Sequence, residues 1–144
     1  AGVGRVHLLP HPCTQKDFRP LVLRRSAATE GAAQADDFLC QYIVLRRDLQ
    51  EKESWPLGAL VAQGCHASVA AVVEHLGDKD VEAYTAPDAI DSMRKAVLEV
   101  KGEKQLRSLA ERLTDAGIDF KLWTEQPENI VTCLATKPAR KSMV

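Results

Sequence analysis

Four stretches of the chain are rich in aliphatic and β-branched residues, a composition that predicts β-strands. They cover residues 40–47, 95–100, 118–122 and 130–136. The first is apolar over most of its length, as is typical of a strand buried on both faces. In the third, Ile118, Phe120 and Leu122 alternate with polar residues, which indicates a strand with one buried face. The residues between the last two strands, 125–129, have the composition of a turn.

Two other stretches show the 3.6-residue period of a helix. The first covers residues 103–116, where Leu106, Leu109, Ala110 and Leu113 follow the i, i+3, i+4, i+7 rule. The second covers residues 57–76 and ends at Gly77. Its larger apolar residues fall on one stripe, which we expect to be buried: Leu60, Val61, Cys65, Val69, Val72, Val73 and Leu76. Gln63 and His66 fall on the opposite side, so we expect both side chains to face solvent.

The alternation of strands and helices predicts the fold class. Strands that alternate with helices are typical of an α/β sandwich with a mainly parallel sheet. The last two strands are joined by residues 125–129 alone, which is too short for a parallel crossover between strands that pair directly. We therefore expect one antiparallel strand in an otherwise parallel sheet.

The first part of the chain differs in composition from the rest. Residues 1–29 contain one acid, Asp17, and five basic residues: Arg5, Lys16, Arg19, Arg24 and Arg25. This composition is typical of an organelle transit peptide, and a disordered extension is the alternative. We expect a leader at 1–37, a folded domain at 38–138 and a basic, frayed tail at 139–144. The location would then be cytoplasmic, or mitochondrial if the leader is a transit peptide.

The charge balance limits the kind of partner. The 144 residues include 19 lysines and arginines and 20 aspartates and glutamates, for a formal net charge of −1. Such a chain does not bind nucleic acid through its overall charge, so a nucleic-acid partner would require a local basic patch. No stretch reaches about 18 consecutive apolar residues, and we expect no membrane partner.

The cysteines and histidines do not indicate a metal site. The four cysteines are too far apart for a compact zinc motif: Cys13, Cys40, Cys65 and Cys133. Three of them lie in predicted strands or in a predicted helix, where a buried thiol is the usual role. We expect reduced thiols and an intracellular setting, with two disulfides as the alternative. Because there is no glycine-rich phosphate loop and no helical histidine pair with ligand spacing, we expect no cofactor and no metal.

One segment of the predicted helix at 57–76 carries candidate chemistry: Val61-Ala62-Gln63-Gly64-Cys65-His66-Ala67. His66 projects from a face made of small residues, which leaves room for a ligand; a merely solvent-exposed histidine is the alternative. With the preceding strand Tyr42-Ile43-Val44-Leu45-Arg46-Arg47-Asp48-Leu49, the segment resembles the opening of the type 2 peptidyl-tRNA hydrolase family. The resemblance covers residues 40–138. The segments 54–56 and 123–129 resemble a divergent branch of that family.

The resemblance implies a fold and a reaction. The fold is a three-layer α/β/α sandwich around a four-stranded mixed sheet. The reaction is hydrolysis of the ester that joins a peptide to the 3′ end of tRNA, with peptidyl-tRNA as the partner. His66 would activate or position water, and Glu125 would orient His66 or stabilise its charge. Gln63 and Thr132 would donate hydrogen bonds to the carbonyl or ribose of the substrate. The oligomeric state stays open, with a homodimer as one option.

The resemblance also implies a substrate-binding patch. Arg46, Arg47 and Lys137, with Arg140, would bind phosphates, and solvated charges at strand ends are the alternative. Asp48 matches the aspartate that follows the first strand in the family, and a loop or helix cap is its alternative role.

Two features of the family are absent, and they favour a second function. Leu57-Gly58-Ala59 stands where the family has a Gly-Lys-x-Lys stretch, and Gln126-Pro127-Glu128-Asn129 replaces a longer Gly-Arg-Thr-like loop. The alternative to a hydrolase is a non-catalytic tRNA- or protein-binding module on the same fold. An exposed patch around Trp55 and Trp123 would indicate a protein partner. A third option is a thiol-dependent enzyme that uses Cys65, although neighbouring helical residues point about 100° apart.

Overall fold

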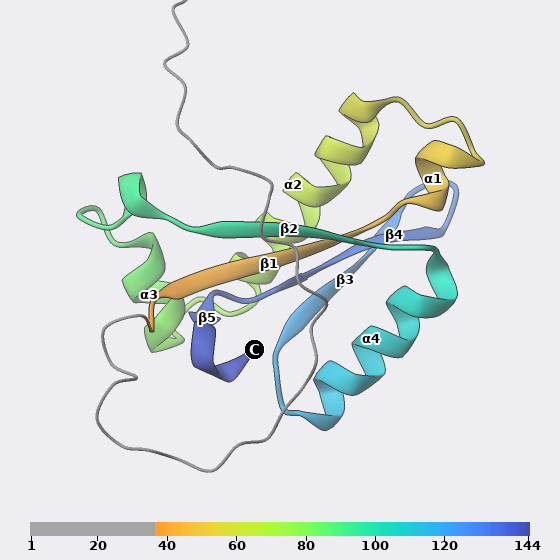
Figure 1. The fold of residues 1–144 in the computed structure, drawn as a ribbon. Helices are drawn as coiled ribbons and strands as arrows, with labels where there is room; N and C mark the ends of the chain where they lie inside the picture. The colour runs from red at the N-terminus through yellow and green to blue at the C-terminus, as the bar shows by residue number, and fades with distance from the viewer. Residues whose placement is uncertain (1–36) are drawn as a thin grey trace, which may run out of the picture. The chain divides into compact units, whose positions relative to one another are not determined.

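A computed structural model of the chain describes residues 37–144 (Figure 1). Within this range the strands are β1 (Leu39–Arg46), β2 (Lys95–Val100), β3 (Phe120–Glu125), β4 (Ile130–Thr136) and β5 (Ala139–Arg140). The α-helices are α1 (Asp48–Glu51), α2 (Leu57–Val73), α3 (Lys79–Thr85) and α4 (Glu103–Asp115), and two 3₁₀ turns cover Ile90–Ser92 and Lys141–Met143. None of these helices has the length and hydropathy needed to span a membrane. The predicted leader lies outside the described residues, apart from Asp37.

The sheet is mixed, as predicted, with the strand order β2-β1-β4-β3 and with β5 added to the start of β1 (Figure 1). The expectation of one antiparallel strand is confirmed by β4, since β1, β2 and β3 run in the same direction, but the pairing between strands is mainly antiparallel rather than parallel. Only the β1–β2 pair is parallel in the described sheet, whereas β4 runs antiparallel to both β1 and β3, and β5 antiparallel to β1. The reason is the position of β4. It follows β3 through a short turn and lies between β3 and β1. These two strands run in the same direction, but because β4 separates them they do not pair with each other.

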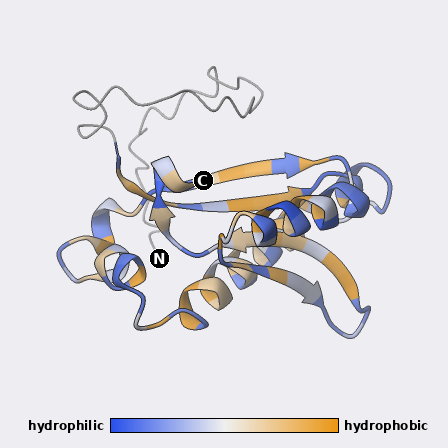
Figure 2. Cartoon of the chain, turned by 90° about the horizontal axis from the view of Figure 1, so that it is seen from below, coloured by the Kyte–Doolittle hydropathy of each residue, from blue (hydrophilic) through white to orange (hydrophobic). Residues whose placement is uncertain are grey.

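Two helices cover opposite faces of the sheet, which confirms the three-layer α/β/α arrangement. On one face, Ala67 and Ala71 of α2 pack against the strand residues Ile43, Cys133 and Ala135. On the other face, Leu106 and Ala110 of α4 pack against Val44, Val131 and Leu134. Figure 2 colours the strands between the two helices mainly as hydrophobic. The sheet is therefore buried on both faces, and it fixes α2 relative to the edge strand β3.

The buried face of α2 is not the one that the sequence pattern predicts. The residues that α2 buries are Leu60, Gln63, Gly64, Ala67, Ser68 and Ala71. Val61, Val69 and Val73, predicted to be in the core, are 54%, 63% and 56% exposed. Small side chains allow the helix to lie close to the sheet: a Cβ added at Gly64 would lie 3.4 Å from Ile43 Cγ2. Side-chain size, rather than hydrophobicity, therefore decides which face of α2 is buried.

A buried amide joins α2 to the sheet. Gln41 on β1 is fully buried, and its Nε2 donates to the carbonyls of Ser68 and Thr136, each at 3.0 Å. Its Oε1 accepts from Ser68 Oγ at 2.7 Å and from Lys95 Nζ at 2.5 Å. All four hydrogen-bonding positions of the amide are therefore used, as the burial of a polar group requires. The contact fixes the position of α2 along β1.

Several other expectations have clear outcomes. The predicted helix at 103–116 is confirmed as α4, with Leu106 and Ala110 buried. The segment after the first strand, predicted to be a loop, begins with the short helix α1. The tail is not frayed, because Arg140 pairs with Leu39 as part of β5 and Ala139 is buried. Cys40 and Cys133 are buried and Cys65 is exposed, and none of the three is paired within the described range. Cys13 lies outside it.

Candidate active site

His66 is exposed on α2, as the sequence predicts, and its ring lies against an aromatic side chain. The His66 imidazole stacks on the Trp123 indole, with 5.1 Å between ring centroids and 23° between ring planes. Trp123 is half-buried on β3 and packs on the cluster that includes Ala67 and Ala71. A ring packed in this way has little freedom to move. It therefore gives His66 a fixed surface on one side while the histidine stays open to solvent.

Glu125 acts on His66 through Trp123 rather than directly. The indole Nε1 of Trp123 donates a hydrogen bond to Glu125 Oε2 at 3.0 Å. Within the described residues no hydrogen bond joins Glu125 to His66. Trp123 and Glu125 lie on the same face of β3, because residues i and i+2 of a strand point to the same side. Glu125 thus fixes the plane of the indole on which His66 stacks.

A β-bulge places Thr132 beside α2. Trp123 pairs with Cys133 and Thr124 pairs with Val131, so Thr132 on β4 has no partner on β3. A bulge of this kind turns a side chain to a different face than strict alternation would. Thr132 is fully buried, and its Oγ1 donates to Gln63 Oε1 at 2.9 Å. The expected direct contact of Thr132 with substrate is therefore incompatible with its burial, and its hydroxyl instead fixes Gln63.

Gln63 is buried, contrary to our expectation, and only the oxygen of its side-chain amide has a hydrogen-bond partner among the described residues. Its side chain is 3% exposed, and its Oε1 accepts from Thr132. Its backbone carbonyl accepts from the Cys133 thiol at 3.1 Å. Burial raises the pKa of that thiol to about 12. The Nε2 of Gln63 donates to none of the described residues, and it is not among the buried polar atoms that lack a partner there. This nitrogen is a hydrogen-bond donor available to a ligand, one helical turn from His66.

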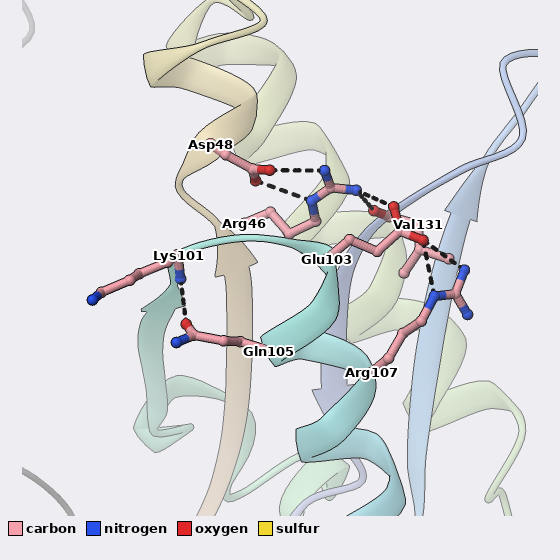
Figure 3. Close-up of polar contacts among 7 residues, drawn as sticks. All are labelled: Arg46, Asp48, Lys101, Glu103, Gln105, Arg107 and Val131. Carbon is pink, nitrogen blue, oxygen red and sulfur yellow. Dashed lines mark hydrogen bonds and ion pairs between the residues drawn. The ribbon is translucent and has the colours of Figure 1, made fainter.

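Arg46 and Asp48 form a structural ion pair rather than a phosphate site (Figure 3). Arg46 is 7% exposed and donates from Nε and Nη2 to the two oxygens of Asp48, both at 3.0 Å. Its Nη1 donates to Glu103 at 2.7 Å and to the Val131 carbonyl at 2.6 Å. The Arg46 hydrogen bond lowers the pKa of Asp48. Gly102 allows the close fit, because a Cβ there would lie 2.8 Å from Asp48 Oδ2. The expectation that Arg46 binds phosphate is therefore incompatible with its geometry.

The other basic residues of the predicted patch are also paired with acids. Arg47 contacts Glu51 and Glu99 at 3.2 and 3.0 Å. Lys137 contacts Asp78 at 2.6 Å and Asp119 at 3.1 Å, and the Asp78 hydrogen bond raises its pKa. Arg140 lies 3.9 Å from Asp80. Each of these basic side chains thus already has a neighbouring carboxylate. Together they do not form a strongly basic surface in the described part of the chain.

The described site brings an imidazole and an amide group within one helical turn of each other. An imidazole held at the surface can accept a proton from water, and an amide donor nearby can stabilise an oxyanion. Trp123 and the bulge at Thr132 are the parts that sequence reasoning missed. Trp123 could have been found, because it directly follows the predicted strand at 118–122 and lies two residues before Glu125. The bulge could not, because it depends on how β3 and β4 pair.

Comparison with known proteins agrees with the observed fold. The sequence model of the family described as "Peptidyl-tRNA hydrolase PTH2" matches residues 39–144. This chain belongs to the PTH2 family. It is similar to the human protein named "Putative peptidyl-tRNA hydrolase PTRHD1", with 47% identity over 124 residues, which is 85% of each chain. The mouse protein of the same name is 46% identical over 125 residues, or 86% of each chain. The PTH2 match begins with β1 and continues to the last residue.

Proposed function

We propose that this PTH2 chain hydrolyses the ester bond between a peptide and the 3′ end of tRNA. The observation that carries the proposal is the position of the exposed His66 one helical turn from the buried Gln63 amide. The structure holds the first by Trp123 and the second by Thr132. The family to which the chain belongs, described as a peptidyl-tRNA hydrolase, supports this substrate class.

In the proposed reaction, His66 acts as the general base. Its imidazole takes a proton from a water molecule, and the water oxygen attacks the ester carbonyl carbon. The carbonyl oxygen becomes an oxyanion and accepts a hydrogen bond from Gln63 Nε2. When the tetrahedral intermediate collapses, the bond to the ribose oxygen breaks and that oxygen takes the proton back from His66. The products are the free peptide and a tRNA with an unmodified 3′ end.

Thr132 is a positioning residue in this scheme. We expect Thr132→Val to lower kcat by about tenfold with little change in KM, because the loss of one hydrogen bond of about 1.4 kcal/mol leaves the Gln63 amide free to rotate. Thr132→Ser keeps the hydroxyl and should retain most of the activity. The measurement is steady-state hydrolysis of an N-blocked aminoacyl-tRNA. Equal losses in the valine and serine variants would contradict this role.

The paired cations predict weak and salt-sensitive tRNA binding. With two or three phosphate contacts, the affinity should fall roughly 10- to 50-fold between about 50 and 200 mM salt. The measurement is a titration of the full chain with a fluorescently labelled, deacylated tRNA at several salt concentrations. An affinity that does not change with salt would show that phosphate contacts are not the basis of binding.

A second candidate is a non-catalytic binding module on the same fold. The observation that favours it is the pairing of each predicted phosphate ligand with a carboxylate. The expected aromatic patch does not add to it, because Trp55 and Trp123 are half-buried. A chain of this kind would bind tRNA or a protein without accelerating ester hydrolysis. The hydrolysis measurement therefore separates the two candidates.

A further inference from the structure

An open pocket lies at the end of the sheet where β1 begins, and it has a volume of about 260 Å³. Segments far apart in the sequence form it: the start of β1, helix α3 with the turn that follows it, and β5 (Figure 1). Leu39 in its wall lies six residues before Leu45, which pairs with Cys133 beside Trp123. At about 3.3 Å per strand residue, the pocket is roughly 20 Å from the candidate active site.

The walls of the pocket are apolar, and its hydroxyl groups already have acceptors. The apolar side chains are Phe38, Leu39, Ala83, Ala89 and Met93. The Tyr84 hydroxyl donates to the Arg94 carbonyl at 2.8 Å, and the Ser92 hydroxyl donates to the Ala89 carbonyl at 2.9 Å. The polar groups that remain for a ligand are therefore the guanidiniums of Arg94 and Arg140.

Arg94 presents an unpaired cation to this pocket. Its carbonyl accepts from the Gln41 amide at 3.0 Å and from Tyr84 at 2.8 Å, so the backbone of Arg94 is fixed. Its exposed side chain lies over the Phe38 ring, with Cζ 4.0 Å from the ring centroid. Within residues 37–144, Arg94 forms no ion pair with an acid. A guanidinium stacked in this way still directs its N–H groups outward and can donate them to an anion.

The end of the chain adds two further cations. The Lys141 amide donates to the Phe38 carbonyl at 3.0 Å, and the Lys141 Nζ lies 5.2 Å from the centroid of the Phe38 ring. Arg140 lies 3.9 Å from Asp80 through Nε, and its Nη1 donates to the Asp37 carbonyl at 3.0 Å. Among the described residues, no carboxylate lines the pocket. The pocket is therefore a local basic patch, which the overall charge of the chain does not provide.

A planar ring that carries a phosphate fits this combination of groups. Unpaired nucleobases stack on aromatic side chains and on arginine planes, and arginine binds phosphate through paired N–H groups. Two guanidiniums from different segments suit a phosphate, which offers more acceptor oxygens than a carboxylate does. We propose that the pocket binds one nucleotide, with its base against the apolar wall and its phosphate between Arg94 and Arg140. The nucleotide belongs either to the unpaired 3′ end of a tRNA or to the free pool, and only the first source rests on the proposed function.

The first test separates the contribution of the base from that of the phosphate. Two-dimensional NMR of the full chain follows the backbone signals of residues 38–39 and 92–94 during titration with AMP, adenosine or ribose 5-phosphate. AMP should shift these signals and bind at least about tenfold more tightly than either fragment, because each fragment makes only part of the contacts. Unchanged signals at every AMP concentration, or equal affinity for AMP and one fragment, would overturn the proposal.

The second test removes one guanidinium. Arg94→Gln should weaken AMP binding by about 10- to 100-fold, the effect of losing hydrogen bonds between charged groups. Arg112→Gln is the matched control, because Arg112 is exposed on α4, lies outside the pocket and has no acidic partner in the described part of the chain. It should bind AMP as wild type does. Both replaced side chains are exposed, so circular dichroism should give both variants the wild-type melting temperature. Unchanged affinity in Arg94→Gln, or an equal loss in both variants, would contradict the assignment.

A third measurement identifies the source of the nucleotide. A short single-stranded RNA that ends in CCA should bind more tightly than AMP if tRNA supplies the nucleotide, and Arg94→Gln should weaken the binding of both. RNA that binds no more tightly than AMP would assign a free nucleotide to the pocket, and either result supports nucleotide binding. RNA binding that Arg94→Gln does not weaken would overturn the tRNA source. None of these measurements involves ester hydrolysis, so failure of the proposed activity and failure of the pocket assignment are distinguishable.

Discussion

Replacing Arg46 with leucine should destabilise the chain by about 3–5 kcal/mol, the effect of breaking a buried ion pair on one side. The guanidinium is the common partner of Asp48, Glu103 and the Val131 carbonyl, so the variant leaves one carbonyl and the Asp48 carboxylate without their donor. These contacts join the end of β1 and the start of β4 to the starts of α1 and α4 (Figure 3). The measurement is the free energy of unfolding in urea.

Arg47→Leu is the matched control for this prediction. Arg47 is adjacent in sequence and also contacts two acids, but its side chain is 41% exposed, compared with 9% for Arg46. Exposed ion pairs contribute about 0–1 kcal/mol, so this variant should be close to wild type. Similar losses in both variants would show that burial of the Arg46 pair does not determine its contribution.

The same ion pair predicts how stability changes with pH. The Arg46 hydrogen bond lowers the pKa of Asp48 in the folded chain. The unfolded value is about 3.9, so the contribution of Asp48 is present at neutral pH and is lost as the pH falls through the folded pKa. Asp48→Asn removes this contribution at every pH. The difference in unfolding free energy between the two proteins should therefore be largest above about pH 5 and shrink toward about pH 2.

Replacing His66 with alanine should lower kcat for peptidyl-tRNA hydrolysis by about 10²–10⁴-fold, the usual contribution of a general base. KM should change little, because the proposed role of His66 is proton transfer rather than binding. The exposed position of His66 means that the variant should fold normally. The measurement is the rate at which an N-blocked amino acid is released from saturating tRNA.

His75→Ala is the control for the His66 variant. His75 follows the same helix, and its Nδ1 contacts the Ala71 carbonyl at 2.8 Å, but it belongs to no part of the proposed site. Its replacement should leave kcat within about twofold, as for a change outside the reacting groups. A loss equal to that of His66→Ala would indicate damage to α2 rather than removal of a base.

The sequence predicted the elements with strong local signals. The β2 strand at 95–100 and the leucine face of α4 depend on periodicity within a few residues, and both are confirmed. The buried face of α2 was predicted wrongly, because the rule assumes that large aliphatic residues are inside. Here Gly64 and Ala67 face the sheet, and the space between helix and sheet accepts only small side chains there.

The sequence suggested His66, Gln63, Thr132 and Glu125 as site residues, but it did not predict their contacts. His66 and Gln63 come from one helical segment, so local sequence was enough to bring them together. The stack of His66 on Trp123 joins residues 57 positions apart, and the Gln63–Thr132 bond joins residues 69 apart. Both depend on the pairing of β3 with β4 and on which face of α2 is buried, and neither is present in a local pattern.

The most direct test of the proposed function is the release of an N-blocked amino acid from its tRNA by the full wild-type chain, measured in a single turnover at low salt. The proposal predicts release well above the uncatalysed rate for wild type and release near the uncatalysed rate for His66→Ala. Wild-type release no faster than the uncatalysed rate would contradict it and would favour a non-catalytic binding module.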